Sequence, residues 1–319
     1  MYLFVTKFFL SDKNDNSCDP TTPTTYLFAY SNDFTAAVVG GVWEYISDIA
    51  FGSPHYSQVG TVRFDVVNEE SIEFNTDKNT AFAAIQAHLP NPSLSFPSTS
   101  TGSDILKTLT KFLNNTQAPI CGSRLFLLVK RYPNETDISE LVGRLRQHHV
   151  VFTAMVSMTP SGGEQASTVY QLASRTNGFC AYNYDEDFEG EAGHVPGFYN
   201  PYLVYASNPQ VPGQSGSTIL PPFPAPTAGS YWFSMTIQDH IPIDSVNTIS
   251  LSWQNGASQD GFGIDQRLYN TNHISNYESL DQVTYNITLQ YSFSDNNPET
   301  IQVRIYGASP INYWAPYDN

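Results

Sequence analysis

The sequence predicts an α/β doubly wound parallel sheet of the Rossmann-like kind, followed by a C-terminal antiparallel β-sandwich. Two observations lead to this prediction. Up to about residue 190, short apolar runs alternate with segments of helical periodicity, which is typical of a parallel sheet covered by helices. Beyond residue 230, alternating segments rich in aromatic and β-branched residues follow one another without a helical pattern, as in a small sandwich.

In the first half, apolar residues recur at a spacing of three to four in five segments, where we expect helices: 34–50, 79–89, 103–115, 137–149 and 167–178. Strands are expected where short apolar runs end at polar or turn residues. The run "SRLFLLVK" is the clearest, since continuous apolarity indicates a central strand covered on both faces. The expected strands are 25–30, 57–67, 71–77, 123–130, 150–157 and 179–184.

In the second half, alternation predicts strands separated by turn-rich segments. They are expected at 231–238, 246–254, 262–269, 282–293 and 300–308. Before them, residues 208–230 are dense in Pro, Gly and Ser, which indicates an extended connection. The predicted organisation is an N-terminal segment (1–19), an α/β domain (20–190), a Pro/Gly/Ser-rich connection (191–229) and a β-sandwich domain (230–319).

Composition and charge exclude some function classes. The chain of 319 residues has 14 Lys and Arg against 30 Asp and Glu, a formal net charge of −16. Such a surface repels nucleic acid and anionic membranes, so we expect no nucleic-acid partner. No stretch of 18 apolar residues occurs, so no transmembrane segment is expected. Only 14% of the residues are charged, and polarity comes from Ser, Thr, Asn and Gln, which favours an extracellular β-rich protein.

The compartment is suggested by three features. Asn114, Asn134 and Asn286 each begin an N-glycosylation sequon. The first ten residues are mostly apolar and are either the remnant of a signal peptide or an edge strand. Three cysteines allow one disulfide bond and one spare thiol in an oxidising compartment, or three buried thiols in the cytosol.

A candidate site lies at the end of the first expected strand, in "TTYLFAYSND" (24–33). A buried strand that ends in small polar residues and leads into a helix is where α/β folds place ligands. The order of elements over residues 20–190 resembles a von Willebrand factor A domain. That family holds a magnesium or calcium ion with a D-x-S-x-S motif, a Thr-Gly at a helix start and an aspartate after the central strand.

The resemblance assigns each ligand position of the family to a residue here. The first aspartate position is Ala29, the two serine positions are Ser31 and Asp33, the threonine is Thr101, and the last aspartate is Lys130. Both aspartates of the family are thus replaced, one of them by a cation. We therefore expect no metal ion and no cofactor, and an ordinary turn at the end of the first strand.

The two-domain layout further resembles a group of secreted nematode proteins in which a degenerate A-type domain precedes a β domain. The stretches "VPGFYNPYLVYASNPQV" and "YWFSMTIQDHIPIDS" carry this resemblance. In a sheet of strand order 3-2-1-4-5-6, the first and fourth strands are neighbours that start at the same end. Cys18 precedes the first strand and Cys121 the fourth, so a bridge between them is expected, which leaves Cys180 free.

The remaining constellations point to binding and not to catalysis. "YDEDFEGE" (184–191) lacks the spacing of a calcium loop and indicates a solvated acidic loop. "GQSGS" is not a nucleophile elbow, and no H-E-x-x-H motif occurs. Aromatic side chains of the sandwich alternate, so one set must face outward or into the domain junction. Trp232, Trp253 and Trp314 are candidates for such a partner surface.

These observations predict a non-enzymatic extracellular protein that binds, adheres or assembles. Its partner would be a protein or a glycan, self-assembly included. One alternative is a carbohydrate-binding module in the β-sandwich, which a cluster of exposed aromatic side chains on one face would favour. A second alternative is a secreted hydrolase, which requires two facing carboxylates in a cleft.

Overall fold

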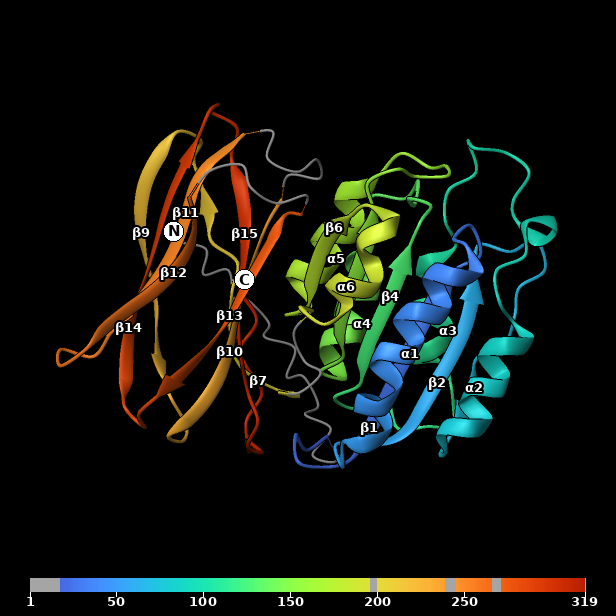
Figure 1. Ribbon diagram of the computed structural model, residues 1–319, viewed down its shortest axis with the longest axis horizontal. Coiled ribbons are helices and arrows are strands. Elements are labelled where there is room, and N and C mark those ends of the chain that lie inside the picture. Colours follow the sequence, from blue (N-terminus) through green and yellow to red (C-terminus); the bar gives the residue numbers. More distant parts are fainter. Residues whose placement is uncertain (1–17, 196–199, 239–244, 266–270, 319) are drawn as a thin grey trace, which may run out of the picture.

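A computed structural model describes residues 18–195, 200–238, 245–265 and 271–318. The chain forms an α/β domain and a β domain that lie side by side (Figure 1). Residues 1–17, on which the signal-peptide alternative depends, lie outside the described residues, as does the end of the strand expected at 262–269. Within the described residues, no helix is long and apolar enough to cross a membrane.

The α/β domain has a six-stranded sheet with the order β3-β2-β1-β4-β5-β6. Neighbouring strands run parallel, except that β3 is antiparallel to β2. This confirms the predicted fold class. The strands are β1 (Thr24–Ser31), β2 (Tyr56–Phe64), β3 (Glu73–Asn75), β4 (Arg124–Val129), β5 (Val151–Ser157) and β6 (Phe179–Asn183).

Helices cover both faces of this sheet (Figure 1). They are α1 (Ala36–Gly52), α2 (Lys78–Ala87), α3 (Ile105–Leu113), α4 (Ser139–Gln147), α5 (Ala166–Arg175) and the short α6 (Phe188–Ala192), with 3₁₀ turns at Pro92–Leu94 and Asp185–Asp187. Side chains of β1 alternate between two cores. Tyr26 and Phe28 pack with α1, α2 and α6, while Leu27 and Ala29 pack with α3, α4 and α5.

The β domain is a sandwich of two antiparallel sheets around one apolar core. The first sheet has the order β13-β10-β15-β7, with β8 paired to β15, and the second has the order β12-β11-β14-β9. The strands are β7 (Tyr202–Ser207), β8 (Gln210–Val211), β9 (Ser215–Pro224), β10 (Gly229–Ile237), β11 (Val246–Gln254), β12 (Gln259–Asp265), β13 (His273–Leu280), β14 (Thr284–Phe293) and β15 (Glu299–Gly307).

The predicted connection at 191–229 is wrong, because most of it belongs to the sandwich. β7, β8 and β9 all lie in this range, and the β domain therefore begins near Tyr202. Three prolines of β9 made the segment resemble a linker. Among the described strands, β9 is an edge strand that pairs with β14 alone. An edge strand tolerates proline, because the N–H groups on its outer side have no partner in the sheet. Strand β13 is also absent from the expected strands, since the polar Asn276 and Glu278 stand in register with the core-facing Phe233 and Tyr231 and interrupt the apolar alternation.

The two domains meet where the outer face of the first sandwich sheet covers the free edge of β6. Alternate side chains of β15 face opposite sides of the sheet. Val303 faces the sandwich core, while Gln302 and Arg304 face the α/β domain. The amide oxygen of Asn272 accepts a hydrogen bond from the N–H of Tyr182 at 2.7 Å. Side chains of the β domain thus bind the backbone N–H groups at the edge of β6, which could otherwise pair with another strand.

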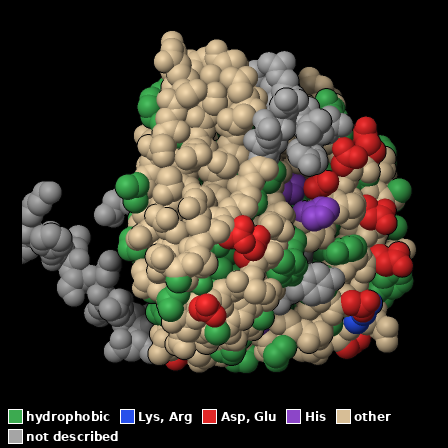
Figure 2. All heavy atoms as spheres, turned by 60° about the vertical axis from the view of Figure 1, so that its left-hand side comes forward, with side chains coloured by type: hydrophobic (Ala, Val, Ile, Leu, Met, Phe, Trp, Pro, Cys, Tyr) green, Lys and Arg blue, Asp and Glu red, His purple; other side chains and the backbone are tan. Residues whose placement is uncertain are grey.

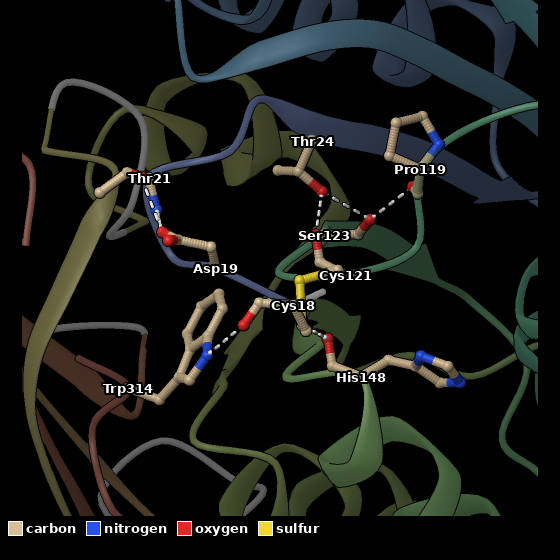
Figure 3. The surroundings of a disulfide bond; sticks show 9 residues. All are labelled: Cys18, Asp19, Thr21, Thr24, Pro119, Cys121, Ser123, His148 and Trp314. Carbon is tan, nitrogen blue, oxygen red and sulfur yellow. Dashed lines mark hydrogen bonds between the residues drawn. A yellow bond between two sulfur atoms is a disulfide. The ribbon is translucent and has the colours of Figure 1, made fainter. Parts of the chain in front are cut away.

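A disulfide bond joins Cys18 to Cys121, with the two Cα atoms 5.4 Å apart, which confirms the pairing expected from the strand order. Figure 3 shows that the C-terminal segment is tied to the same place, because Trp314 Nε1 donates to the carbonyl oxygen of Cys18 at 3.3 Å. Cys180 is a free thiol buried in β6. Burial raises its pKa well above the ordinary value of a thiol.

Candidate functional site

Polar side chains gather at the carboxyl edge of the parallel sheet. Ser31 ends β1, Asp65 follows β2, Lys130 and Arg131 follow β4, and Ser157 ends β5. The carboxyl ends of parallel strands lie on one edge, so residues far apart in the chain come together there. This edge is where the sequence placed its candidate site.

The central contact of this edge is a buried ion pair between Asp33 and Arg131. Nε of Arg131 donates to Asp33 Oδ2 at 2.8 Å, and the two side chains are 4% and 6% exposed. Ser161 donates its hydroxyl to the same carboxylate oxygen. Nη1 of Arg131 donates to the carbonyl oxygens of Ser98 and Thr101, each at 2.8 Å. The guanidinium thus links Asp33, just after β1, to residues 98–101, and Asp33 in turn binds Ser161.

The other residues assigned by the resemblance lie at different depths. Ala29 is inside β1, fully buried, and its methyl group packs in the core below the edge. Lys130 pairs with Asp185 at 2.7 Å and donates to the hydroxyl oxygens of Ser157 and Thr159 at 3.1 and 2.8 Å. Lys130 therefore connects the ends of β4, β5 and β6, and its ammonium also lies 6.0 Å from the ring centroid of Phe34, which follows β1.

Asp65 is a member of this edge that the sequence did not single out. Its carboxyl accepts hydrogen bonds from the hydroxyls of Ser31 and Ser103, at 2.5 and 2.6 Å, and from the N–H of Asp104 at 3.1 Å. It is fully buried and adopts a left-handed backbone, with φ at 61°. The strand expected at 57–67 includes Asp65, whereas β2 ends at Phe64, so Asp65 lies just beyond the strand.

Burial dominates the chemistry of Asp65. The pKa of its carboxyl is raised to about 8, mainly by desolvation; the nearby carboxylates of Asp104 and Asp33 act in the same direction, while the hydroxyls of Ser103 and Ser31 oppose the shift. The N–H of Asp65 in turn donates to Asp104 Oδ1 at 2.7 Å. This reciprocal pair fastens the end of β2 to the start of α3.

Residues of the acidic loop at 184–191 make two separate sets of ion-pair contacts. Asp185 pairs with Lys130, and one oxygen of Glu191 lies 3.3 Å from His273 Nε2 of the β domain and 3.5 Å from His194 Nδ1. Figure 2 shows histidine and acidic side chains adjoining on the surface there. Among the described residues, no group of three or more His, Cys, Asp or Glu is arranged to hold a metal ion.

Of the three tryptophans expected on a partner surface, Trp253 is buried in the sandwich core, whereas Trp232 and Trp314 are half-buried at or beside the domain junction. Trp253 is 2% exposed and stacks on Phe233 in the sandwich core, with the ring centroids 4.3 Å apart. Trp314 stacks on His149 of the α/β domain at 4.5 Å. Trp232 is partly buried and packs against a small apolar cluster beside the domain junction. Alternation in the sequence predicts that β10 has two distinct faces, but the packing of the two domains determines what covers each face.

The three sequon asparagines are all exposed, but their contacts differ. Asn114 Oδ1 accepts a hydrogen bond from Arg144 at 2.7 Å, and Asn114 lines an open groove of 670 Å³ between α3 and β3. Asn134 Nδ2 donates to the carbonyl oxygen of Ser100 at 2.9 Å. Asn286 lies on the outer face of β14.

Comparisons with known proteins cover both domains. A family model described as a domain of unknown function (DUF7154) matches residues 207–308, which is most of the β domain. No curated protein matches the chain.

Solved structures resemble parts of the chain at low identity. The crystal structure of the SpRpn10 VWA domain is 12% identical with a TM-score of 0.39, and the match covers 54% of this chain and 95% of that one. A von Willebrand factor type A protein from Catenulispora acidiphila is 7% identical with a TM-score of 0.36, over 91% of this chain and 66% of that one. A carbohydrate-binding module of Cellvibrio mixtus lichenase 5A, in complex with cellotriose, is 12% identical with a TM-score of 0.21, over 35% and 93%.

Proposed function

We propose that this protein is a non-enzymatic extracellular binding, adhesion or assembly protein whose A-type half works without a bound metal ion. The observation that carries the proposal is the Asp33–Arg131 pair, in which a guanidinium takes the place beside the carboxylate that a metal ion would need. The neutral side chain of Ala29 and the ammonium of Lys130 stand where the family has its two aspartates.

The residues of this edge do not fit a divalent ion. Such an ion needs an oxygen shell that carries negative charge. The Asp33 carboxylate is already neutralised by Arg131, and the raised pKa of Asp65 favours the uncharged carboxyl near neutral pH. Removing one partner of a buried ion pair strongly destabilises a folded protein, because the other charge is left without compensation. The pair therefore resists displacement by an added cation.

Two features of the chain support the extracellular compartment. Disulfide bonds form and persist in oxidising compartments, and Cys18 is bonded to Cys121. The three sequon asparagines are exposed in the folded chain, as acceptors of bulky glycans must be. A surface with a net charge of −16 fits a protein or neutral glycan partner better than nucleic acid.

Neither alternative gains a specific observation. The tryptophans that would build a sugar-binding face are taken up by the sandwich core and the domain junction. The 670 Å³ groove has Glu69 as its single acidic residue among the described residues that line it, whereas glycoside hydrolysis requires a pair.

Thermal unfolding in chelator and in millimolar magnesium or calcium tests the metal-free proposal. An ion at 100 times its Kd would stabilise the native state by about 2.7 kcal/mol, which is several degrees in Tm. We expect the same Tm in all three buffers, and a large drop in Asp33→Ala that no metal reverses. A rise in Tm with metal in the natural protein, lost in Asp33→Ala, would overturn the proposal.

A further inference from the structure

The sequon of Asn286 lies on a strand in a way that the other two do not. In β14, side chains alternate between the two faces, so Asn286 and Thr288 point outward while Ile287 between them is completely buried in the sandwich core. Both residues that define the sequon are therefore presented on one flat face. The side chain of Asn286 makes no hydrogen bond to the described residues.

An exposed isoleucine lies beside this sequon. Ile219 of β9 is 81% exposed, more than any other large hydrophobic side chain among the described residues. It is paired directly with Thr288, and Asn286 is the next outward residue along β14. Diagonal neighbours of this kind on one sheet face lie about 7–8 Å apart, within reach of a bulky group.

The surrounding face carries no charged side chain among the described, paired outward residues of β9, β14 and β11. The outward residues paired across β9, β14 and β11 are Ser, Thr, Asn and Gln, apart from Ile219 and Pro224. They are Ser215, Ser217, Ile219, Pro224, Thr248, Ser250, Ser252, Gln254, Thr284, Asn286, Thr288, Gln290 and Ser292. Figure 2, in which the β domain is turned toward the reader, shows a broad area of uncharged polar side chains and backbone.

We propose that Asn286 carries an N-linked glycan whose first sugars pack on Ile219 and lie over this uncharged sheet face. A pyranose ring has an apolar C–H face and a rim of hydroxyl groups. The first matches the exposed side chain of Ile219, and the second matches the hydroxyl and amide groups around it. The glycan accounts for an isoleucine that is otherwise left in water on an outer sheet face.

The modification is a group transfer from a lipid diphosphate-linked oligosaccharide, made by the transferase of the secretory pathway. Nδ2 of Asn286 forms a bond to the anomeric carbon of the first sugar. The bond from that carbon to the diphosphate oxygen breaks, the lipid diphosphate leaves with the electron pair, and one amide proton passes to a base. This inference rests on the extracellular compartment of the proposed function.

Contacts distinguish Asn286 from the other two sequons. Asn134 already uses its amide nitrogen to hold the carbonyl of Ser100, and the amide oxygen of Asn114 holds Arg144. Only at Asn286 is the amide free of such bonds to the described residues, with an apolar side chain beside it to receive the sugar.

Occupancy is tested by expressing the full chain in a eukaryotic secretory host and measuring glycopeptide masses. We expect a glycan at Asn286 that is lost in Asn286→Gln and Thr288→Ala and kept in Thr288→Ser, which preserves the sequon. A glycan at Asn114 or Asn134 with none at Asn286 would overturn this inference and leave the compartment standing. A chain secreted with all three sites empty would overturn it too, while a chain that is not secreted would refute the compartment.

Packing on Ile219 is tested by a double-mutant cycle in Tm. Asn286→Gln should lower Tm by about 2 °C in the natural background and by much less in the Ile219→Thr background, since the contact is then already lost. The same four proteins from a bacterial host, which carry no glycan, should show no such coupling. Equal Tm changes in both backgrounds of the glycosylated series would mean that the glycan does not pack on Ile219.

Discussion

The side-chain oxygen of Gln302 accepts a hydrogen bond from the backbone N–H of Cys180 at 2.9 Å. A residue of the β domain thus pairs with a backbone group at the edge strand β6 of the α/β sheet. The same oxygen accepts from Thr236 Oγ1 at 2.7 Å, and the amide nitrogen donates to Ser174 Oγ at 2.9 Å. Gln302 is completely buried. At Gln302 the two domains are therefore joined as in a protein interior, where buried polar groups are paired by hydrogen bonds.

Replacing Gln302 should destabilise the whole chain. Gln302→Leu keeps a similar volume but leaves the N–H of Cys180 and the hydroxyl of Ser174 buried without this partner. Each such group costs about 1–3 kcal/mol, so we expect a loss of roughly 3 kcal/mol in the free energy of unfolding. Urea denaturation measures it. Gln171→Leu, on the exposed side of α5, is the matched control and should change stability by less than about 0.5 kcal/mol. Equal midpoints for the two variants would contradict this account of the junction.

Asp65 should make stability fall as pH rises. The pKa of its carboxyl is raised from 3.8 to about 8 in the folded chain, so between these values the folded state holds a proton that the unfolded state has released. Stability from this group is full below pH 3.8 and is lost as pH rises through about 8, with a slope of at most about 1.4 kcal/mol per pH unit.

Comparing the pH dependence of unfolding in Asp65→Asn with that of the natural chain measures this contribution. An asparagine stays neutral at every pH, so the variant should lose the decline and become the more stable protein, relative to the natural chain, as pH increases. Asp281→Asn, at an exposed position, serves as the control. A decline that persists unchanged in Asp65→Asn would show that other groups cause it.

The Cys18–Cys121 bond should stabilise the chain mainly through its unfolded state. The bond closes a loop with a sequence separation of 103, and long loops restrict the unfolded ensemble most. We expect Cys18→Ser/Cys121→Ser to lose about 2–4 kcal/mol in urea denaturation. Reductant should weaken the natural chain to the same level and leave the double variant unaffected. A double variant as stable as the oxidised protein would show that the bond constrains little.

Much of the fold follows from local pattern. The helical period at 137–149 and the apolar run before Lys130 are properties of neighbouring residues, and the structure has α4 and β4 at these places. The strand order that the von Willebrand A resemblance implies brought Cys18 and Cys121 together, and these are bonded. Local pattern failed at β9, where prolines are permitted because the strand is at an edge, and edge position is a property of the whole sheet.

The sequence by itself determined the alternation of strands and helices, the change to a sandwich, and the neutral Ala29 and cationic Lys130 along the first and fourth strands. Only the tertiary structure decided that Asp33 would be neutralised by Arg131, 98 residues away, and that Asp65 would be buried without a cation. The physical reason is that periodicity acts over a few residues, whereas the charge balance of a buried group depends on which loops meet in space.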